Sequence, residues 1–244
     1  MENLMRKLTS WLFAALLVLS LLLGTACSEA KYELDDGDGE LYQLEMPENG
    51  ETIAILHTTL GDLTVRFFEE DAPKAVKNFI THAKNGYYDG CEFFFTEADF
   101  VIQSGNPENN FVGGESIWGK DFEDEFSPKL HHLYGALSMA NNQEEDTNGS
   151  QFFFVANKNI SAVYTFDKLQ SLQKENKAYG YTDKINAEYQ SGGCPWLDRK
   201  HTVFGQIIDG WKVMDKISRQ ETDEEGKPVV AVVIESIEVT TYQG

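Results

Sequence analysis

Basic residues are scarce in this chain. The sequence holds 20 lysines and arginines against 40 aspartates and glutamates, and its formal net charge is −20. A field of this sign repels phosphate backbones, which argues against nucleic acid as a partner. It also repels an anionic membrane surface, so charge would not attach the chain to a membrane. Solubility is the simplest explanation of the acidic excess.

Cysteine is scarce as well, with three in the sequence. Cys27 lies near the N-terminus, so Cys91 and Cys194 are the two in the body of the chain. An extracytoplasmic pair can form a disulfide, but we interpret these two as independent thiols because a sequence does not supply the required Cβ geometry. His131 and His132 lack companion ligands at metal spacing, so we predict no metal site.

The N-terminal apolar run is too short for a typical membrane span. Residues 11–23 are uncharged, follow Arg6 and Lys7, and lead into small residues before Cys27, whereas a span needs about 20 apolar residues. The pattern predicts a signal peptide over residues 1–26. Its end resembles a bacterial lipoprotein signal in which Cys27 is lipidated, although Gly24 takes the place of the usual leucine. An uncleaved anchor helix and an ordinary cleaved signal are the alternatives, and all three place the folded part outside the cytoplasm.

Two further segments follow the predicted signal. Residues 27–50 are rich in acidic residues and glycine and poor in large apolar ones, which predicts an acidic flexible tether. A charged surface loop is the alternative. Residues 51–244 contain no internal repeat and suffice for one domain with a full core.

Apolar residues in that domain mostly follow a period of two. Residues 52–56 and 63–67 predict a hairpin with its turn at 60–62. A helix is expected from Pro73, with Asp71 as its cap and Gly86 as its stop. A second short helix is expected near 213–217. Further strands are predicted at 92–95, 100–103, 136–140, 151–155, 202–208 and 229–239. Many short strands with two helices favour a barrel.

Several motifs in fixed order carry more information. They are residues 85–90 (NGYYDG), 100–107 (FVIQSGNP), 135–141 (GALSMAN), 147–153 (TNGSQFF) and 196–205 (WLDRKHTVFG). The set resembles the signatures of the cyclophilins, prolyl cis-trans isomerases that bind X-Pro peptides on the wall of a β-barrel. The resemblance implies a mainly β fold: a closed cyclophilin-like β-barrel with two capping helices. Residues 157–193 have no counterpart of this length in the family, so we interpret them as a partly helical insertion, in which Phe166, Leu169 and Leu172 have helical spacing.

The resemblance also implies a site for the substrate. The proline pocket would be formed by Phe100, Val101, Phe153, Leu197 and His201. Gln103 and Gln151 would supply polar contacts, Ala140 and Asn141 would hold the peptide backbone, and Trp196 would form the rim. We assign Gln103 and Asn141 to the catalytic set together with position 95.

Position 95 departs from the family pattern. The chain reads Phe93-Phe94-Phe95-Thr96 where the family carries Phe-His-Arg-Val, so Phe95 replaces the catalytic arginine. A phenyl ring cannot donate to the amide nitrogen. Arg199, which replaces the usual glycine near the rim, is one candidate substitute. Alternatively, the remaining pocket would give weak catalysis by binding the twisted peptide alone.

The predicted function is therefore peptidyl-prolyl isomerisation, weakened by Phe95, on X-Pro bonds of extracytoplasmic proteins whose folding it assists. It needs no cofactor. The expected partners are proline-containing segments of secreted or surface proteins, bound by a monomer that the Cys27 lipid anchors to the bacterial cell membrane. The alternatives are a non-catalytic proline-peptide-binding or chaperone module and a solute-binding lipoprotein, whose larger two-lobed architecture is not indicated. The insertion would form a lid or partner surface, or pack on the barrel side.

Overall fold

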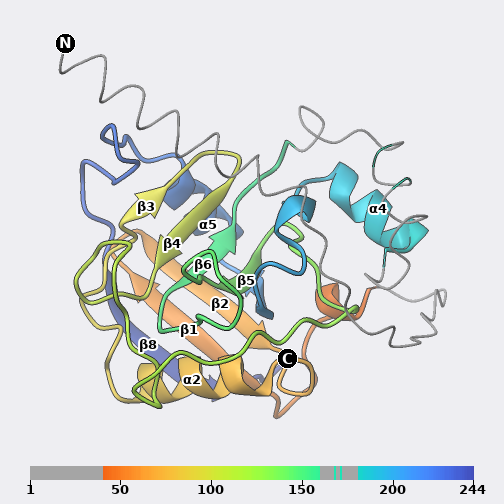
Figure 1. Cartoon of the computed structure of the whole chain (residues 1–244), viewed down its shortest axis with the longest axis horizontal. Coiled ribbons are helices and arrows are strands. Elements are labelled where there is room, and N and C mark those ends of the chain that lie inside the picture. Colours follow the sequence, from red (N-terminus) through yellow and green to blue (C-terminus); the bar gives the residue numbers. More distant parts are fainter. Residues whose placement is uncertain (1–40, 160–167, 169–170, 172–180) are drawn as a thin grey trace. The chain divides into compact units, whose positions relative to one another are not determined.

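The computed structural model describes residues 41–159, 168, 171 and 181–244 (Figure 1). The chain divides into two compact units, Met1–Lys31 and Tyr32–Gly244. The predicted signal peptide, Cys27 and most of the predicted tether lie outside the described residues. Among the helices that the structure does describe, none has the length and apolar character needed to cross a membrane.

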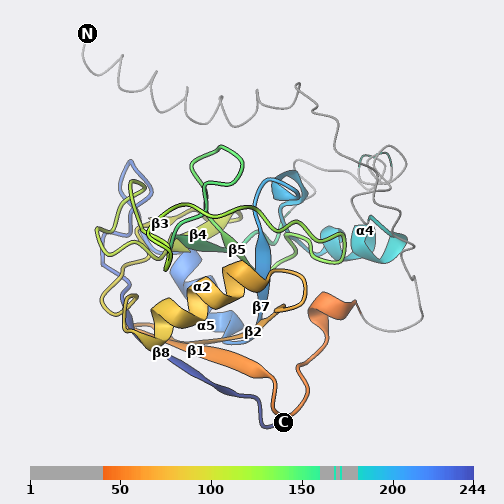
Figure 2. The same cartoon turned by 60° about the horizontal axis from the view of Figure 1, so that its bottom comes forward.

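The second unit contains one antiparallel sheet of eight strands. The strands lie in the order β3-β4-β6-β5-β7-β2-β1-β8. The sheet curls strongly, as Figures 1 and 2 show. The strands are β1 Thr52–Thr58, β2 Gly61–Phe67, β3 Phe95–Thr96, β4 Val101–Ser104, β5 Ala136–Met139, β6 Phe152–Val155, β7 Val203–Asp209 and β8 Ile234–Thr241. The predicted hairpin is confirmed, because β1 pairs with β2 from Ile53–Arg66 to Thr58–Gly61.

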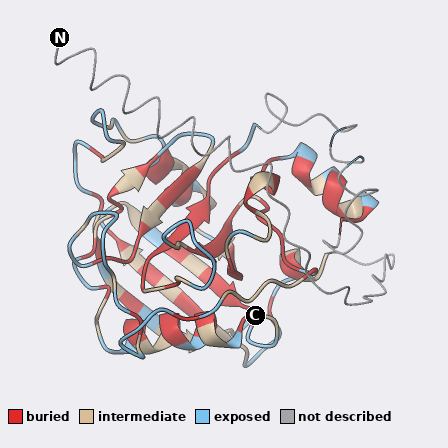
Figure 3. Ribbon diagram, viewed as in Figure 1, coloured by how far each residue is buried: buried red, intermediate tan, exposed pale blue. Residues whose placement is uncertain are grey.

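Strand alternation gives the middle of the sheet two buried faces. Successive residues of a strand point to opposite faces. One face of β4, β5 and β6 sends Ile102, Leu137 and Phe154 into the main core with α2 and α5. The other face sends Val101 and Phe153 into a second, smaller cluster. Figure 3 shows these strands buried and the loops around them mostly exposed.

The first predicted helix is α2, Pro73–Lys84, but its cap differs from the prediction. Asp71 accepts a hydrogen bond from Ser127, and the N-cap residue Ala72 has no capping side chain. The carboxylate of Glu125 caps the helix instead, accepting from the backbone N–H groups of Lys74 at 2.9 Å and Ala75 at 2.9 Å. A carboxylate there also suits the positive end of the helix dipole.

The second predicted helix is α5, Trp211–Ser218, which buries Met214 and Ile217 in the main core. The insertion contributes a further helix, α4, Asp183–Gln190. Thr182 caps it by accepting from the N–H of Ile185. The predicted helical stretch containing Phe166, Leu169 and Leu172 lies outside the described residues.

Two predicted strands are shorter than expected. Strand character in the 92–95 segment begins only at Phe95, and β8 starts at Ile234, so residues 229–233 are not part of it. The segment before β3 meets the start of β8 and the residues just before it, because Gly90 N donates to Ile234 O and Phe93 N donates to Val232 O, each at 2.8 Å. A fully closed barrel and the role of its helices as caps stay predictions.

The domain as folded begins before residue 51. A short 3-10 helix, η2 (Tyr42–Leu44), buries Gln43. The Gln43 side chain donates to His131 O at 2.8 Å and accepts from His131 N at 2.8 Å. The end of the predicted tether is thus docked on the domain by an amide that pairs with a backbone segment far along the chain.

Both cysteines of the domain are buried free thiols, as predicted. Cys91 lies in the main core and Cys194 in the smaller cluster. Burial raises the pKa of the Cys91 thiol to about 12 and that of the Cys194 thiol further still, so neither is a reactive thiolate at neutral pH.

Candidate functional site

Pairing across four strands, β3, β4, β6 and β5, aligns predicted site residues in a row. Phe95 of β3 pairs with Gln103 of β4, Gln103 pairs with Phe153 of β6, and Phe153 pairs with Ser138 of β5. Directly paired residues of antiparallel strands point to the same face. The row therefore lies on the face opposite the main core, and the side chains from three separate motifs become neighbours.

Most of the predicted residues meet in one apolar group on this face, which we call the site cluster. Its members are Phe95, Phe100, Val101, Ala140, Phe153, Trp196 and Leu197. The rings of Phe100 and Trp196 stack with centroids 6.3 Å apart, and His201 meets Phe153 edge to face at 5.3 Å. Phe153 and Leu197 are buried, whereas Phe100, Trp196 and His201 remain partly exposed. The cluster therefore has a fixed base and an accessible rim.

The two predicted glutamines form the polar side of the site. Gln103 Nε2 donates to Gln151 Oε1 at 2.8 Å. Gln151 Nε2 in turn donates to the carbonyls of Phe111 and Gly113. Gln103 uses one amide N–H in this pair, and its carbonyl Oε1 is the atom of the side chain that can accept from a ligand N–H.

The motif before Gln151 is structural. A Cβ on Gly149 would lie 2.1 Å from the carbonyl oxygen of Gly114, so a larger residue cannot take this position. The hydroxyl of Ser150 donates to Gly105 O, and its N–H donates to Gly114 O. This motif ties two loops to the strand and places Gln151.

The residues predicted to hold the peptide backbone sit at the end of β5. Ala140 N donates to Gln151 O at 3.0 Å. The Asn141 side chain is engaged locally, donating to Lys200 O at 2.8 Å and accepting from Gln143 N. Any contact of Asn141 with a peptide would therefore use its backbone.

His201 is held as a neutral imidazole. Burial lowers its pKa to about 3, and repulsion from His132 adds to the effect. Its Nδ1 lies 3.1 Å from Met139 O, and a carbonyl only accepts, so Nδ1 carries the proton. At neutral pH His201 presents an uncharged ring to the cluster.

Sequence reasoning missed the aromatic surroundings of Phe95. The Phe111 ring lies against Phe94 at 5.2 Å and against Phe95 at 5.4 Å, and Phe111 is 53 % exposed. Gly226 also lies against Phe95, since a Cβ there would lie 2.7 Å from the ring. The candidate substitute Arg199 lies with its guanidinium 5.9 Å from the centre of the Phe126 ring.

The adjacent histidines His131 and His132 engage a carboxylate. Both His131 and His132 contact Asp198, the aspartate of the predicted rim motif. Across the described ranges, no group of three or more His, Cys, Asp or Glu side chains is placed to hold a metal ion. In the sequence, Asp198 stood out only as a member of the 196–205 motif. Its contact with the two histidines was not predicted.

The comparisons with known proteins agree with this geometry. Residues 53–239 match the sequence profile described as "Cyclophilin type peptidyl-prolyl cis-trans isomerase/CLD". A protein of Staphylococcus aureus strain USA300, named "Putative peptidyl-prolyl cis-trans isomerase", is 48 % identical over 193 residues, covering 79 % of this chain and 93 % of its own. A similarly named Staphylococcus epidermidis protein is 45 % identical with the same coverage.

Solved structures lead to the same family. A Cryptosporidium parvum cyclophilin type peptidyl-prolyl cis-trans isomerase superposes with a TM-score of 0.62 at 28 % identity, covering 79 % of this chain and 99 % of that one. Its structure in the presence of the dipeptide Ala-Pro gives a TM-score of 0.61 at 29 % identity, covering 78 % and 99 %. This chain therefore belongs to the cyclophilin-type peptidyl-prolyl cis-trans isomerase family, and its enzyme class is isomerase. The roles of the individual site residues stay predictions.

Proposed function

We propose that the chain isomerises X-Pro bonds of extracytoplasmic proteins, at a rate lowered by Phe95, and so assists their folding. The proposal is carried by one observation: motifs from β3, β4, β6 and the 196–201 segment place their side chains on one face of the sheet. Family membership supplies the chemistry. The arrangement supplies an apolar surface beside a pair of amides, which fits a proline ring and the backbone next to it.

The reaction needs stabilisation of a twisted amide. Rotation about a peptide bond has a barrier of about 18–20 kcal/mol, and at the transition state the nitrogen regains its lone pair. Phe153, Leu197 and His201 would hold the proline ring, while Gln103 Oε1 accepts a backbone N–H of the substrate. The rate enhancement then comes from the fit of this surface to the twisted peptide. The reaction requires neither a nucleophile nor a cofactor.

The missing donor sets the expected size of the defect. Losing one preorganised donor typically costs about 2.7–4 kcal/mol, or about 100- to 1,000-fold in rate. The Phe95 side chain supplies no N–H, and its ring contacts Phe111 and lies against Gly226. We therefore expect turnover well below that of a relative that carries the arginine, with less effect on binding.

The location of this activity is also part of the proposal. Residues 1–26 have the charge and apolar pattern of a signal, and Cys27 follows small residues. A lipidated Cys27 would leave the domain on the outer side of the bacterial cell membrane, where secreted and surface proteins fold. Palmitate labelling of wild type and Cys27→Ala in cells tests this step, and equal labelling of both would refute it.

A second candidate function is favoured by the aromatic face around position 95. Phe111 is exposed and extends the ring of Phe95 outward. An exposed apolar surface of this kind favours holding a bound apolar peptide over releasing it. The alternative is therefore a proline-peptide-binding or chaperone module with little turnover.

NMR exchange spectroscopy on an Ala-Pro peptide separates the two functions. The purified domain should speed cis-trans exchange above the spontaneous rate and bind the peptide. Binding without faster exchange would refute the enzymatic proposal and support the binding module. Phe153→Ala is the matched variant, because it should remove both binding and exchange if the site cluster is the site.

A further inference from the structure

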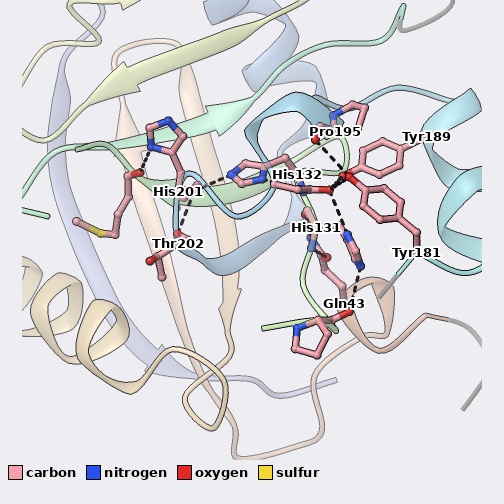
Figure 4. Close-up of polar contacts among 12 residues, drawn as sticks. Gln43, His131, His132, Tyr181, Tyr189, Pro195, His201 and Thr202 are labelled. Atoms are coloured by element: carbon pink, nitrogen blue, oxygen red, sulfur yellow. Dashed lines mark hydrogen bonds and ion pairs between the residues drawn. The ribbon is translucent and has the colours of Figure 1, made fainter. Parts of the chain in front are cut away.

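Asp198 joins the insertion to the back of the site cluster. Its side chain is only 6 % exposed, yet both oxygens are saturated with donors. Oδ1 accepts from the N–H of His132 at 2.8 Å and from His132 Nδ1 at 2.8 Å. Oδ2 accepts from the hydroxyls of Tyr181 at 2.7 Å and Tyr189 at 2.5 Å, and lies 3.2 Å from His131 Nδ1. Figure 4 shows the two tyrosines and the two histidines converging on this point.

The hydrogen bonds keep the carboxylate ionised. Burial alone would raise the pKa of Asp198, but the hydrogen bonds and charge of His131 and His132 outweigh it and hold the pKa well below its usual range. Burial and the adjacent Asp198 charge raise the pKa of Tyr189. The Tyr189 hydroxyl therefore stays protonated, and both tyrosine hydroxyls donate to a full negative charge, which makes these bonds short and directional.

His132 carries this arrangement to the site cluster. Its ring stacks on Phe153 with an interplanar angle of 15° and a centroid distance of 5.9 Å. Its Nε2 lies 3.0 Å from the hydroxyl of Ser138, the residue that pairs with Phe153 across the strands. His201 meets the same His132 ring at 6.3 Å. One imidazole thus supports two residues of the predicted proline surface from behind.

The tyrosines come from the insertion. Tyr181 precedes α4 and Tyr189 lies within it, and both pack with Leu133 in a separate apolar cluster. Trp196 packs on that cluster as well as on the site cluster. The described end of the insertion therefore touches the back of the site through Asp198 and through the rim tryptophan.

We propose that Tyr181 and Tyr189 are positioning residues of the isomerase site: through Asp198 they fix His132, and His132 fixes the rings of Phe153 and His201. The inference rests on the proposed peptide site. Without the two phenol donors, Oδ2 keeps only the longer His131 contact. The carboxylate then rotates, and the His132 ring bonded to it turns away from Phe153. The insertion has a role in substrate binding as well as in stability.

The test is the double variant Tyr181→Phe/Tyr189→Phe, which removes two hydroxyls and keeps the ring volumes. Tyr134→Phe is the matched control, because that hydroxyl also donates to an aspartate, Asp215, at 2.8 Å, but on α5. Two quantities are measured on folded protein: the dissociation constant for an Ala-Pro peptide and the ring-to-ring NOE between His132 and Phe153.

We expect the double variant to bind the peptide about tenfold more weakly, because displacing a binding group by about 1 Å costs up to about 100-fold. The NOE should weaken in parallel, and kcat should change less than affinity. Tyr134→Phe should stay within about twofold, as expected for an independent site. Wild-type affinity together with an unchanged NOE in the double variant overturns the proposal.

Two further outcomes remain informative. If wild-type protein binds no Ala-Pro peptide, the proposed function fails, and the NOE alone decides whether the tyrosines position His132. If the double variant does not fold, the two single variants carry the same comparison. An intact NOE in both would overturn the positioning role.

Discussion

Restoring an arginine at position 95 tests the account of the site most directly. Phe95 stands on β3 opposite Gln103, on the face that carries the site cluster. In Phe95→Arg the aliphatic stem would take the place of the ring beside Gly226. The guanidinium would lie near Gln103, whose Oε1 can accept one of its five N–H groups. The variant therefore adds a donor where the twisted amide is expected.

The structure sets both the gain and the cost. One preorganised donor is worth about 2.7–4 kcal/mol, so kcat/KM can rise by at most about 100- to 1,000-fold. Removing the Phe95 ring loses its contact with Phe111, and aromatic pairs contribute about 0.5–1.5 kcal/mol beyond their buried area. We expect a rise of at least about tenfold, since 1.36 kcal/mol of the possible gain already gives that factor, and a modest loss of stability.

Matched substitutions separate the effect of the donor from that of charge or size. Phe95→Lys adds a point charge without the planar fork and should give a smaller gain. Phe95→Leu keeps the position apolar and should give none. Exchange NMR and a protease-coupled assay on the same Ala-Pro peptide measure turnover, and near-UV circular dichroism confirms folding. A folded Phe95→Arg protein that binds the peptide but turns it over no faster than wild type would show that the missing donor is misplaced.

Three further predictions concern the scaffold that holds the site. Glu125→Ala removes the cap of α2 and should lower the free energy of unfolding by about 1–2 kcal/mol in urea titrations. Gly149→Ala should cost at least about 2 kcal/mol by the same measurement, because its Cβ would meet the Gly114 carbonyl at 2.1 Å. The lowered pKa of His201, about 3 against about 6.5 when unfolded, makes the unfolded state bind more protons, so stability should fall as pH drops below about 6.5.

Each of these predictions has its own control. Glu123→Ala should leave stability nearly unchanged, because that exposed carboxylate only pairs with Lys74 on the surface. Equal losses for Glu125→Ala and Glu123→Ala would contradict the capping assignment. A Gly149→Ala protein as stable as wild type would disprove the close approach to Gly114. His201→Asn should flatten the pH dependence of stability between about pH 4 and pH 5.5 by nearly one proton, and an unchanged slope would refute it.

The strands and both expected helices were predictable because their signals are local. Alternating apolar residues fix which side of a strand is buried, so β1, β2, β4 and β6 lie close to where the sequence places them. The prediction failed at segments whose pairing depends on the edge of the sheet. Residues 229–233 have strand composition, but β8 begins only at Ile234.

The grouping of the candidate site residues was predictable, because the ordered motifs name residues that the fold brings together. Phe100, Val101, Phe153 and Leu197 share one cluster, as the resemblance implied. Their supports were not predictable. The cap on α2 comes from Glu125, about 50 residues beyond the helix start, and no local pattern points to a partner at that distance.

The sequence by itself determined the family, the acidic charge and the alternation of the strands, and it predicts the missing donor at position 95, because each is a property of residue type or local order. Only the tertiary structure decided that Phe111 covers Phe95 and that Tyr181 and Tyr189 meet His131 and His132 at Asp198. The physical reason is that a buried carboxylate must collect donors from whichever segments the packing brings within hydrogen-bond distance. Chain separation does not limit that choice, so it becomes visible only when the chain is folded.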